Sequence, residues 1–176
     1  GVAIPDVYKV LATKDGMDRA WAKLEEIAPH ITVWYRGGSQ SAQLLRDGEV
    51  DIIHMGHNRV ESVIASGRKV GYRFDGGTMD IDALMVPRGA PNKANAMRLI
   101  NELLKSEAQA RLAKAMPLGP VNINAFKTGI ISEAEALKVN THASNIGKQL
   151  LVDPNFYVGR LDMLTERFDR IKQKRG

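Results

Sequence analysis

The stretch Gly-Gly-Thr-Met-Asp-Ile-Asp-Ala-Leu-Met-Val-Pro, residues 76–87, decides the fold, because it sets acidic side chains at the start of an otherwise apolar segment. The pattern predicts a strand that begins after a Gly-Gly turn and ends at Pro87. Side chains alternate along a strand, so Asp80 and Asp82 lie on the same face. Buried carboxylates lose free energy unless they meet hydrogen-bond donors or a cationic ligand. The alternative interpretation is a pair of solvated turn acids.

Strand and helix patterns alternate through the residues before this stretch. Runs of apolar and β-branched residues predict strands at residues 2–4, 31–35, 50–55 and 69–74. Helical spacing follows in residues 7–11, capped by Asp6, in residues 17–28, and in two segments that end at Gly48 and Gly67. The near-continuous apolar run of residues 50–55 is typical of a strand buried on both faces of a parallel sheet. The sequence therefore predicts an α/β fold in which helices flank a sheet.

The pattern becomes helical after Pro87. A helix is predicted from Asn92, with a core stripe that includes Met97 and Leu103. Residues 106–109 and 132–135 both have the spacing of a capping box, and residues 159–172 predict a closing helix. We expect the helices of residues 92–116 to expose apolar surface unless another chain or lobe covers them.

Composition narrows the class of protein. The chain has 176 residues, 44% hydrophobic and 26% charged, which fits one soluble globular domain. It contains no cysteine, which excludes disulfides, thiolate metal sites and a cysteine nucleophile. No apolar run approaches the roughly 20 residues that span a bilayer, and we expect any signal peptide to lie upstream of Gly1.

The net charge of +5 does not indicate nucleic-acid binding. Basic side chains are scattered, and they lack the interleaved aromatic residues that stack on single-stranded bases. They are denser only at the end of the last predicted helix, which we interpret as solvated: Arg167, Arg170, Lys172, Lys174 and Arg175.

Two local motifs have features of binding sites. His54 and His57 are three residues apart with Glu61 nearby, but the segment passes from a strand into a turn, so helical spacing does not apply and we predict no metal site. Residues 37–41 open a helix, where free backbone N–H groups either face a ligand or are simply capped. Because no catalytic motif is present, we expect a protein that is not an enzyme and that needs no cofactor.

The order of four motifs is more specific than any one of them. They are Ala-Ile-Pro-Asp at residues 3–6, Gly-Gly-Ser-Gln-Ser-Ala-Gln-Leu-Leu at residues 37–45, Gly-Glu-Val-Asp-Ile-Ile at residues 48–53 and the acidic stretch described above. This series resembles the C-terminal half of the periplasmic solute-binding proteins of spermidine/putrescine-type ABC importers, which are type II periplasmic binding proteins. The resemblance implies two α/β lobes, of which the N-terminal half is absent. Residues 1–79 and 127–176 would belong to the second lobe, and residues 80–126 would be a crossover strand and helices of the first.

The resemblance also implies binding residues. Asp82 and Asp6 fall on acidic positions that hold a ligand ammonium group, and Asn155 falls on an amide position. Ser39 is a further candidate apart from the resemblance, if the helix start at residues 37–41 faces a ligand and is not simply capped. Three residues depart from the polyamine pattern, because tryptophans or an acid are expected in their places: Asp80, Gly56 and Lys9. These departures weaken the polyamine interpretation.

Arg59 adds a positive charge to this set. It follows the predicted strand of residues 50–55, at the end where open α/β sheets bind ligands, and its guanidinium suits a carboxylate. With Asp82 it would select a zwitterion such as γ-aminobutyrate over a polyamine. The alternatives are an Arg59–Asp82 salt bridge and a solvated Arg59.

These observations together predict the solute-binding component of an ABC importer. It would be periplasmic, capture a small amine-bearing solute by lobe closure, and meet a membrane permease but no nucleic acid. We expect the isolated chain to bind its solute weakly and to self-associate. The alternative is the ligand-sensing domain of a LysR-type transcription regulator, which a DNA-binding motif upstream would favour.

Overall fold

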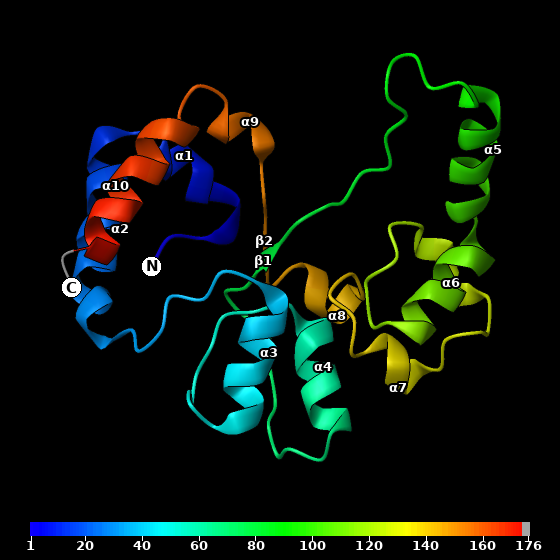
Figure 1. Cartoon of the computed structure of the whole chain (residues 1–176), viewed down its shortest axis with the longest axis horizontal. Coiled ribbons are helices and arrows are strands. Elements are labelled where there is room, and N and C mark those ends of the chain that lie inside the picture. Colours follow the sequence, from blue (N-terminus) through cyan, green and yellow to red (C-terminus); the bar gives the residue numbers. More distant parts are fainter. Residues whose placement is uncertain (174–176) are drawn as a thin grey trace. The chain divides into compact units, whose positions relative to one another are not determined.

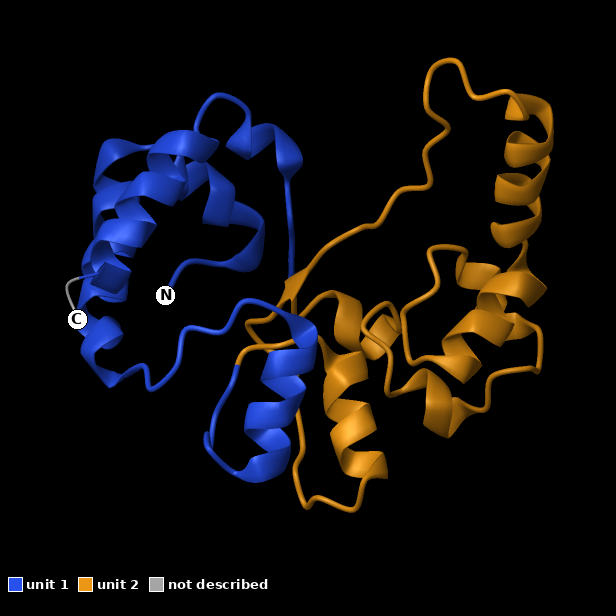
Figure 2. Ribbon diagram, viewed as in Figure 1, with its two compact units in different colours: residues 1–53, 150–176 blue, residues 54–149 orange. Residues whose placement is uncertain are grey.

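The computed structural model describes residues 1–173, which fall into two compact units. Unit 1 contains residues 1–53 and the segment that begins at Leu150, and unit 2 contains residues 54–149 (Figure 2). Figure 1 gives the order of the elements along the chain. Lys174 and Arg175, from the predicted basic helix end, lie outside the described residues.

Unit 1 is mainly helical. Its elements are η1 (Ile4–Asp6), α1 (Val7–Leu11), α2 (Lys14–Ile27), η2 (Ala28–His30), α3 (Gly38–Asp47), β2 (Leu150–Leu151), α9 (Pro154–Tyr157) and α10 (Leu161–Gln173). The core forms where Trp21 and Ala28 meet Ile171 of α10. Phe168 packs edge to face on Trp34, with ring centroids 5.3 Å apart. The predicted helices of residues 7–11, 17–28 and 159–172 are confirmed, with shifted ends for the last two.

The start of α2 differs from the prediction because Thr13 caps it. The Thr13 hydroxyl accepts a hydrogen bond from the backbone N–H of Gly16 at 3.1 Å, so the helix begins before Met17. The predicted cap by Asp6 is wrong. Asp6 has φ −102° and ψ −3° at the end of a 3₁₀ turn, not the extended backbone of a capping residue, and its carboxylate instead pairs with Lys9 at 3.0 Å. Gly48 ends α3 as predicted, with a left-handed φ of 75°.

One core cluster of unit 2 forms around α6 (Ser106–Ala115). The elements of this unit are α4 (His57–Ala65), β1 (Thr78–Met79), α5 (Lys93–Leu103), α6 (Ser106–Ala115), η3 (Ile123–Lys127), α7 (Glu133–Ala136) and α8 (Ala143–Ile146). Ala110 and Ala113 of α6 pack against Ala125, Ile131 and Ala136. Small side chains on α6 let the following turns approach closely, and the larger Phe126 and Ile130 pack against the cluster.

One predicted capping box is confirmed and the other is wrong. The Ser132 hydroxyl accepts from the backbone N–H of Glu135 at 3.3 Å, and the Glu135 carboxylate accepts from the N–H of Ser132 at 2.8 Å. At the start of α6 the capping position is Lys105, and no side chain caps it. Gln109, the expected partner of Ser106, instead donates to the carbonyl of Leu103 at 2.8 Å and accepts from the N–H of Val121 at 3.1 Å.

Of the predicted strands, only the start of the one after the Gly-Gly turn is a strand in the described chain, as β1. Residues 31–35, 50–55, 69–74 and 80–87 are extended or irregular, and residues 2–4 lead into η1. A strand requires a neighbouring backbone that pairs with its N–H and C=O groups, and a hydrophobic pattern alone does not supply one. The burial expected for two of these segments is wrong as well, since Ile52 is 93% exposed and Met85 is 86% exposed.

The helices α5 and α6 carry an uncovered apolar surface, as the sequence predicts. Met97, Leu99, Leu103, Leu104 and Leu112 are each at least two-fifths exposed. What covers this surface stays a prediction. Among residues 1–173, no helix combines the length and the apolar character needed to cross a membrane.

Gly16 is the position in unit 1 where a side chain is least tolerable, and it gives a stability prediction. A Cβ atom there would overlap the carbonyl oxygen of Val10, and backbone cannot move aside cheaply. Gly16→Ala should lower the free energy of unfolding by about 1–3 kcal/mol. The measurement is urea denaturation followed by circular dichroism.

Gly147→Ala is the matched control. Gly147 has φ −74°, which any residue adopts, and nothing lies within 4 Å of its Cβ position. This variant should change stability by less than about 0.5 kcal/mol. Equal stability of the two variants would contradict the close approach of α1 and α2.

Candidate ligand-binding site

Arg59 lies in the first turn of α4, at the surface of unit 2. The carbonyl of Gly56 accepts from the backbone N–H groups of Arg59 at 2.9 Å and Val60 at 3.4 Å, which fixes the start of the helix. The Arg59 side chain is exposed, and in the described part of the chain no acidic group pairs with it. Its guanidinium is therefore available to an anionic group from outside unit 2.

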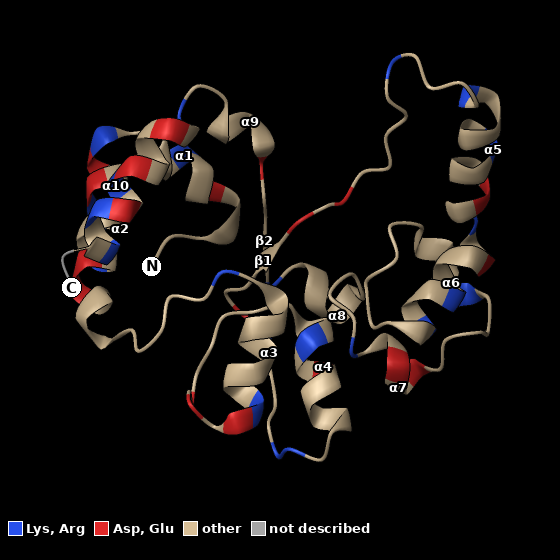
Figure 3. Ribbon diagram, in the orientation of Figure 1, with Lys and Arg blue, Asp and Glu red and all other residues tan. Residues whose placement is uncertain are grey.

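Asp80 and Asp82 lie on the extended segment that follows β1. The ribbon of Figure 3 marks acidic residues in red along this segment and a basic residue in blue at the start of α4. Both carboxylates are exposed, and Asp80 accepts a hydrogen bond only from the backbone N–H of Ile81, at 3.0 Å. Within residues 1–173 Asp82 forms no ion pair, so the Arg59–Asp82 salt bridge considered above is absent.

A cluster of five side chains, here called the His57 cluster, anchors the helix that carries Arg59. It consists of His57, Glu61, Tyr72, Phe74 and Lys138. The Tyr72 hydroxyl bonds the Glu61 carboxylate at 2.8 Å and the carbonyl of Lys138 at 3.0 Å. Lys138 also donates to Glu61 at 3.2 Å. The cluster thus joins α4 to two segments that are remote in sequence.

Burial dominates the ionisation of two members of the cluster. It raises the pKa of Tyr72 well above its usual value, and the neighbouring Glu61 carboxylate adds to the shift. Burial also lowers the pKa of His57, against the opposing effects of a backbone hydrogen bond with Pro117 and of Glu61. At neutral pH, Tyr72 is therefore a protonated donor and His57 is uncharged.

Three predicted residues, Asp6, Asn155 and Ser39, belong to unit 1. The structure brings the surroundings of the first two together, because the backbone N–H of Asp153 donates to the Tyr8 hydroxyl at 3.1 Å. Tyr8 also packs on Phe156, with ring centroids 5.1 Å apart. Asp6 and Asn155 are both exposed beside this α1–α9 contact, and Asp6 is paired with Lys9.

Ser39 lies in the first turn of α3, and it is exposed. No side chain caps this helix at Gly37, while Gln40 accepts from the backbone N–H of Arg36 at 2.9 Å, outside the helix. The ligand-facing alternative for residues 37–41 therefore stays a prediction.

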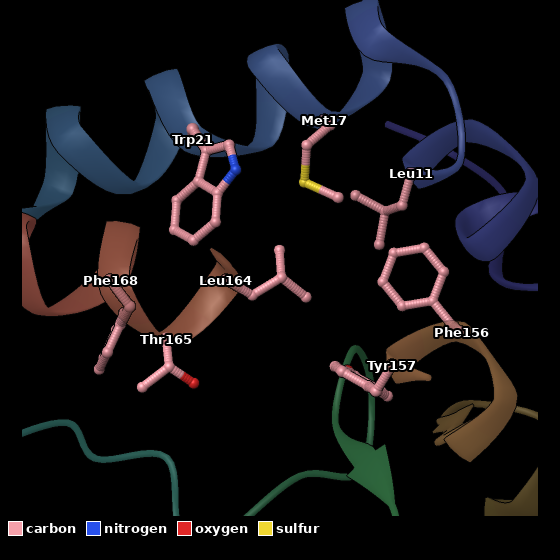
Figure 4. A pocket seen from close by; sticks show the side chains of 8 residues that line it. All are labelled: Leu11, Met17, Trp21, Phe156, Tyr157, Leu164, Thr165 and Phe168. Carbon is pink, nitrogen blue, oxygen red and sulfur yellow. The ribbon is translucent and has the colours of Figure 1, made fainter. Parts of the chain in front are cut away.

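Unit 1 also contains an apolar pocket of about 340 Å³ (Figure 4). It is lined by Leu11, Met17, Trp21, Phe156, Tyr157, Leu164, Thr165 and Phe168. None of these side chains carries a charge, so the pocket offers no ion-pair partner for an ammonium or carboxylate group. It is continuous with the core packing around Trp21.

The contacts of the His57 cluster are not predicted from the sequence, where His57 stands out only as a possible metal ligand beside His54. The available signals were the four-residue spacing of His57 and Glu61 in a helix, and the alternation of Tyr72 and Phe74 in an extended segment. Neither signal identifies the contact with Lys138, which depends on the tertiary fold.

A family model for bacterial extracellular solute-binding proteins matches residues 1–139 of this chain. Among curated proteins, a γ-aminobutyric acid-binding protein of Pseudomonas aeruginosa strain PAO1 is 32% identical over 169 residues, covering 96% of this chain and 47% of that protein.

Solved structures give the same grouping. The PBP MotA of A. tumefaciens B6, in complex with glucopine, superposes with a TM-score of 0.83 and 32% identity over 96% of this chain and 52% of its own. An ABC transporter substrate-binding protein of Bradyrhizobium japonicum USDA 110 gives 0.80 and 36% identity over 88% of this chain and 48% of its own. These similarities confirm the predicted fold class, and the family is one of transport components that are not enzymes.

The chain spans about half the length of the relatives it matches. One of these relatives is a γ-aminobutyric acid-binding protein and another is in complex with glucopine, so the spermidine/putrescine type of specificity is not confirmed. The division into residues 1–79, 80–126 and 127–176 concerns lobe membership and stays a prediction.

The His57 cluster gives a prediction about coupled stability. Tyr72→Phe removes the hydroxyl from Glu61, whose side chain is only 17% exposed, and should cost about 1–3 kcal/mol of unfolding free energy. Glu61→Leu, which removes both carboxylate oxygens, should cost a similar amount. Because both changes break the same contact, the double variant should cost clearly less than the sum in a denaturation experiment.

Glu26→Leu is the control for this cycle. Glu26 pairs with Lys23 at 2.6 Å, but both side chains are about two-thirds exposed, so loss of the pair should cost less than about 0.5 kcal/mol. Additive effects of Tyr72→Phe and Glu61→Leu would show that the two groups do not act together.

Proposed function

This chain belongs to the bacterial extracellular solute-binding protein family, and we propose that it is part of the component of an ABC importer that captures a small amine-bearing solute. The solute class that the residues favour is an ω-amino acid such as γ-aminobutyrate. The protein would act in the periplasm, deliver the solute to a membrane permease, and perform no chemistry on it.

The observation that carries this proposal is that two residues of opposite charge, Arg59 and Asp82, lack ion-pair partners within residues 1–173. Both side chains are exposed in unit 2. An opposite charge on the ligand would pair with each. Arg59 offers a planar fork of N–H donors to a carboxylate, and Asp82 offers a carboxylate to an ammonium group. A zwitterion satisfies both.

A polyamine is the less favoured solute. Its ammonium groups would be repelled by Arg59, and Lys9 adds a second cation beside Asp6 in unit 1, at 3.0 Å. The similarity to a γ-aminobutyric acid-binding protein, at 32% identity, supports the same choice.

The remaining predicted contacts are secondary in this proposal. Asp80, Asp6, Asn155 and Ser39 would contribute further polar contacts once the solute is enclosed. Proteins that close two lobes around a ligand take contacts from both lobes. Since this chain spans about half of its relatives, we expect a lobe like their additional one to complete the site. The exposed apolar surface of α5 and α6 would then be covered by that lobe, and in its absence by self-association.

Binding of γ-aminobutyrate tests the proposal. In a protein that joins this chain to the lobe its relatives have in addition, Arg59→Gln or Asp82→Asn should each weaken binding by at least about 30-fold in calorimetry. The reason is that an unpaired, desolvated charge on the ligand costs on the order of 2–5 kcal/mol. The isolated chain should bind weakly.

Arg73→Gln and Asp75→Asn are matched controls in unit 2. They form an exposed pair at 3.6 Å that includes neither Arg59 nor Asp82, and should leave affinity unchanged. Putrescine binding more tightly than γ-aminobutyrate would refute the selection of a zwitterion, and unaltered affinity of the Arg59→Gln variant would remove Arg59 from the site.

A further inference from the structure

His57 is held in an environment that suits only its uncharged form. Its ring packs edge to face on Phe74, with centroids 5.3 Å apart, and lies 6.1 Å from the ring of Tyr72. The Nε2 atom is buried and has no hydrogen-bond partner. Proline has no N–H group, so the backbone group of Pro117 that acts on His57 is its carbonyl oxygen. A protonated ring carries an N–H group on both nitrogens, so Nε2 would then be a buried donor.

The protonated form of His57 would have a buried N–H group at Nε2 without a hydrogen-bond acceptor. An unpaired buried charge is strongly disfavoured. The acidic group nearest in sequence, Glu61, already accepts from Tyr72 at 2.8 Å and from Lys138 at 3.2 Å. The other titratable group against the ring is the Tyr72 phenol, which stays uncharged. Phe74 and Pro117 supply only apolar surface and a carbonyl.

The position of His57 in the helix adds to this effect. It is the first residue of α4, a helix of 9 residues, so its side chain lies at the positive end of the helix dipole. A cation is disfavoured there. Two residues later, Arg59 belongs to the same first turn, which is fixed by its hydrogen bond to Gly56 at 2.9 Å.

We propose that His57 is an acid-sensitive contact that holds the first turn of α4, so that acidification loosens this turn and weakens the hold on Arg59. The loosening is a property of unit 2 alone. Its consequence for solute affinity, weaker binding in acid, rests on the proposed function.

The sign of the pH dependence follows from the burial of His57. Burial lowers the pKa of His57 in the folded chain, so the unfolded chain binds more protons as the pH falls below about 6.5. Folding stability is therefore complete at neutral pH and declines toward acid. Once the pH is below the pKa of His57 in the folded chain, the ring is protonated in both states and causes no further loss of stability.

The test compares thermal unfolding of the whole chain at about pH 8 and about pH 5. Wild type should lose more stability than His57→Phe, with a difference in midpoint shift of roughly 3 °C or more. His57→Phe keeps an aromatic ring but cannot titrate. His30→Gln is the control, because His30 is exposed, and it should behave as wild type. Equal midpoint shifts in wild type and His57→Phe would overturn the proposal.

A measurement on the wild-type chain covers the case in which His57→Phe fails to fold. Nuclear magnetic resonance should show His57 titrating below the ordinary histidine value of about 6.5, and the amides of Arg59 and Val60 should lose exchange protection, corrected for intrinsic rates, as His57 titrates. Titration of His57 at or above about 6.5, or unchanged protection of α4, would overturn the proposal. Loss of γ-aminobutyrate binding at every pH would count against the proposed function only, since neither readout contains ligand.

Discussion

The hydroxyl group of Tyr72 holds together parts of unit 2 that are far apart in sequence. It bonds the Glu61 carboxylate of α4 and the carbonyl of Lys138, and Lys138 bonds Glu61 in turn. In a unit with one very short strand, these contacts replace the ladder that would otherwise fix an extended segment against a helix. The placement of α4, and with it the placement of Arg59, depends on this small polar network.

Rigid support decides how well an exposed charge can bind a ligand. A solvated arginine on a mobile turn would bind a carboxylate weakly, because ordering it costs conformational entropy. Arg59 instead follows a helix start that is fixed by the Gly56 carbonyl and by the packing of His57 on Phe74. Asp82 lacks such support in this chain, since its segment is extended and exposed. The two proposed ligand contacts therefore differ in how far each is organised before a solute arrives.

Helices and their ends were largely predictable from sequence, because helix signals are local. The capping box of Ser132 and Glu135 and the left-handed Gly48 needed no tertiary information. The capping box expected at Ser106 failed because Gln109 found partners at Leu103 and Val121, one of them 12 residues away. Most of the strand predictions are wrong for a related reason. Pairing depends on a neighbouring backbone, which the pattern of residues 50–55 does not specify. The candidate ligand residues came from a resemblance and from charge, whereas the His57 cluster is purely tertiary.

The extended segment of residues 80–87 has a practical consequence. Ile81, Leu84 and Met85 are exposed by 58–86%, and few of the backbone groups around them are hydrogen-bonded within the described chain. Proteases bind substrates as extended chains, and Arg88, which is exposed directly after Pro87, supplies a cleavage site for trypsin-like enzymes. A chain handled in a crude lysate would therefore be nicked here first, and the cut would separate β1 from α5 while leaving the His57 contacts with Phe74 intact.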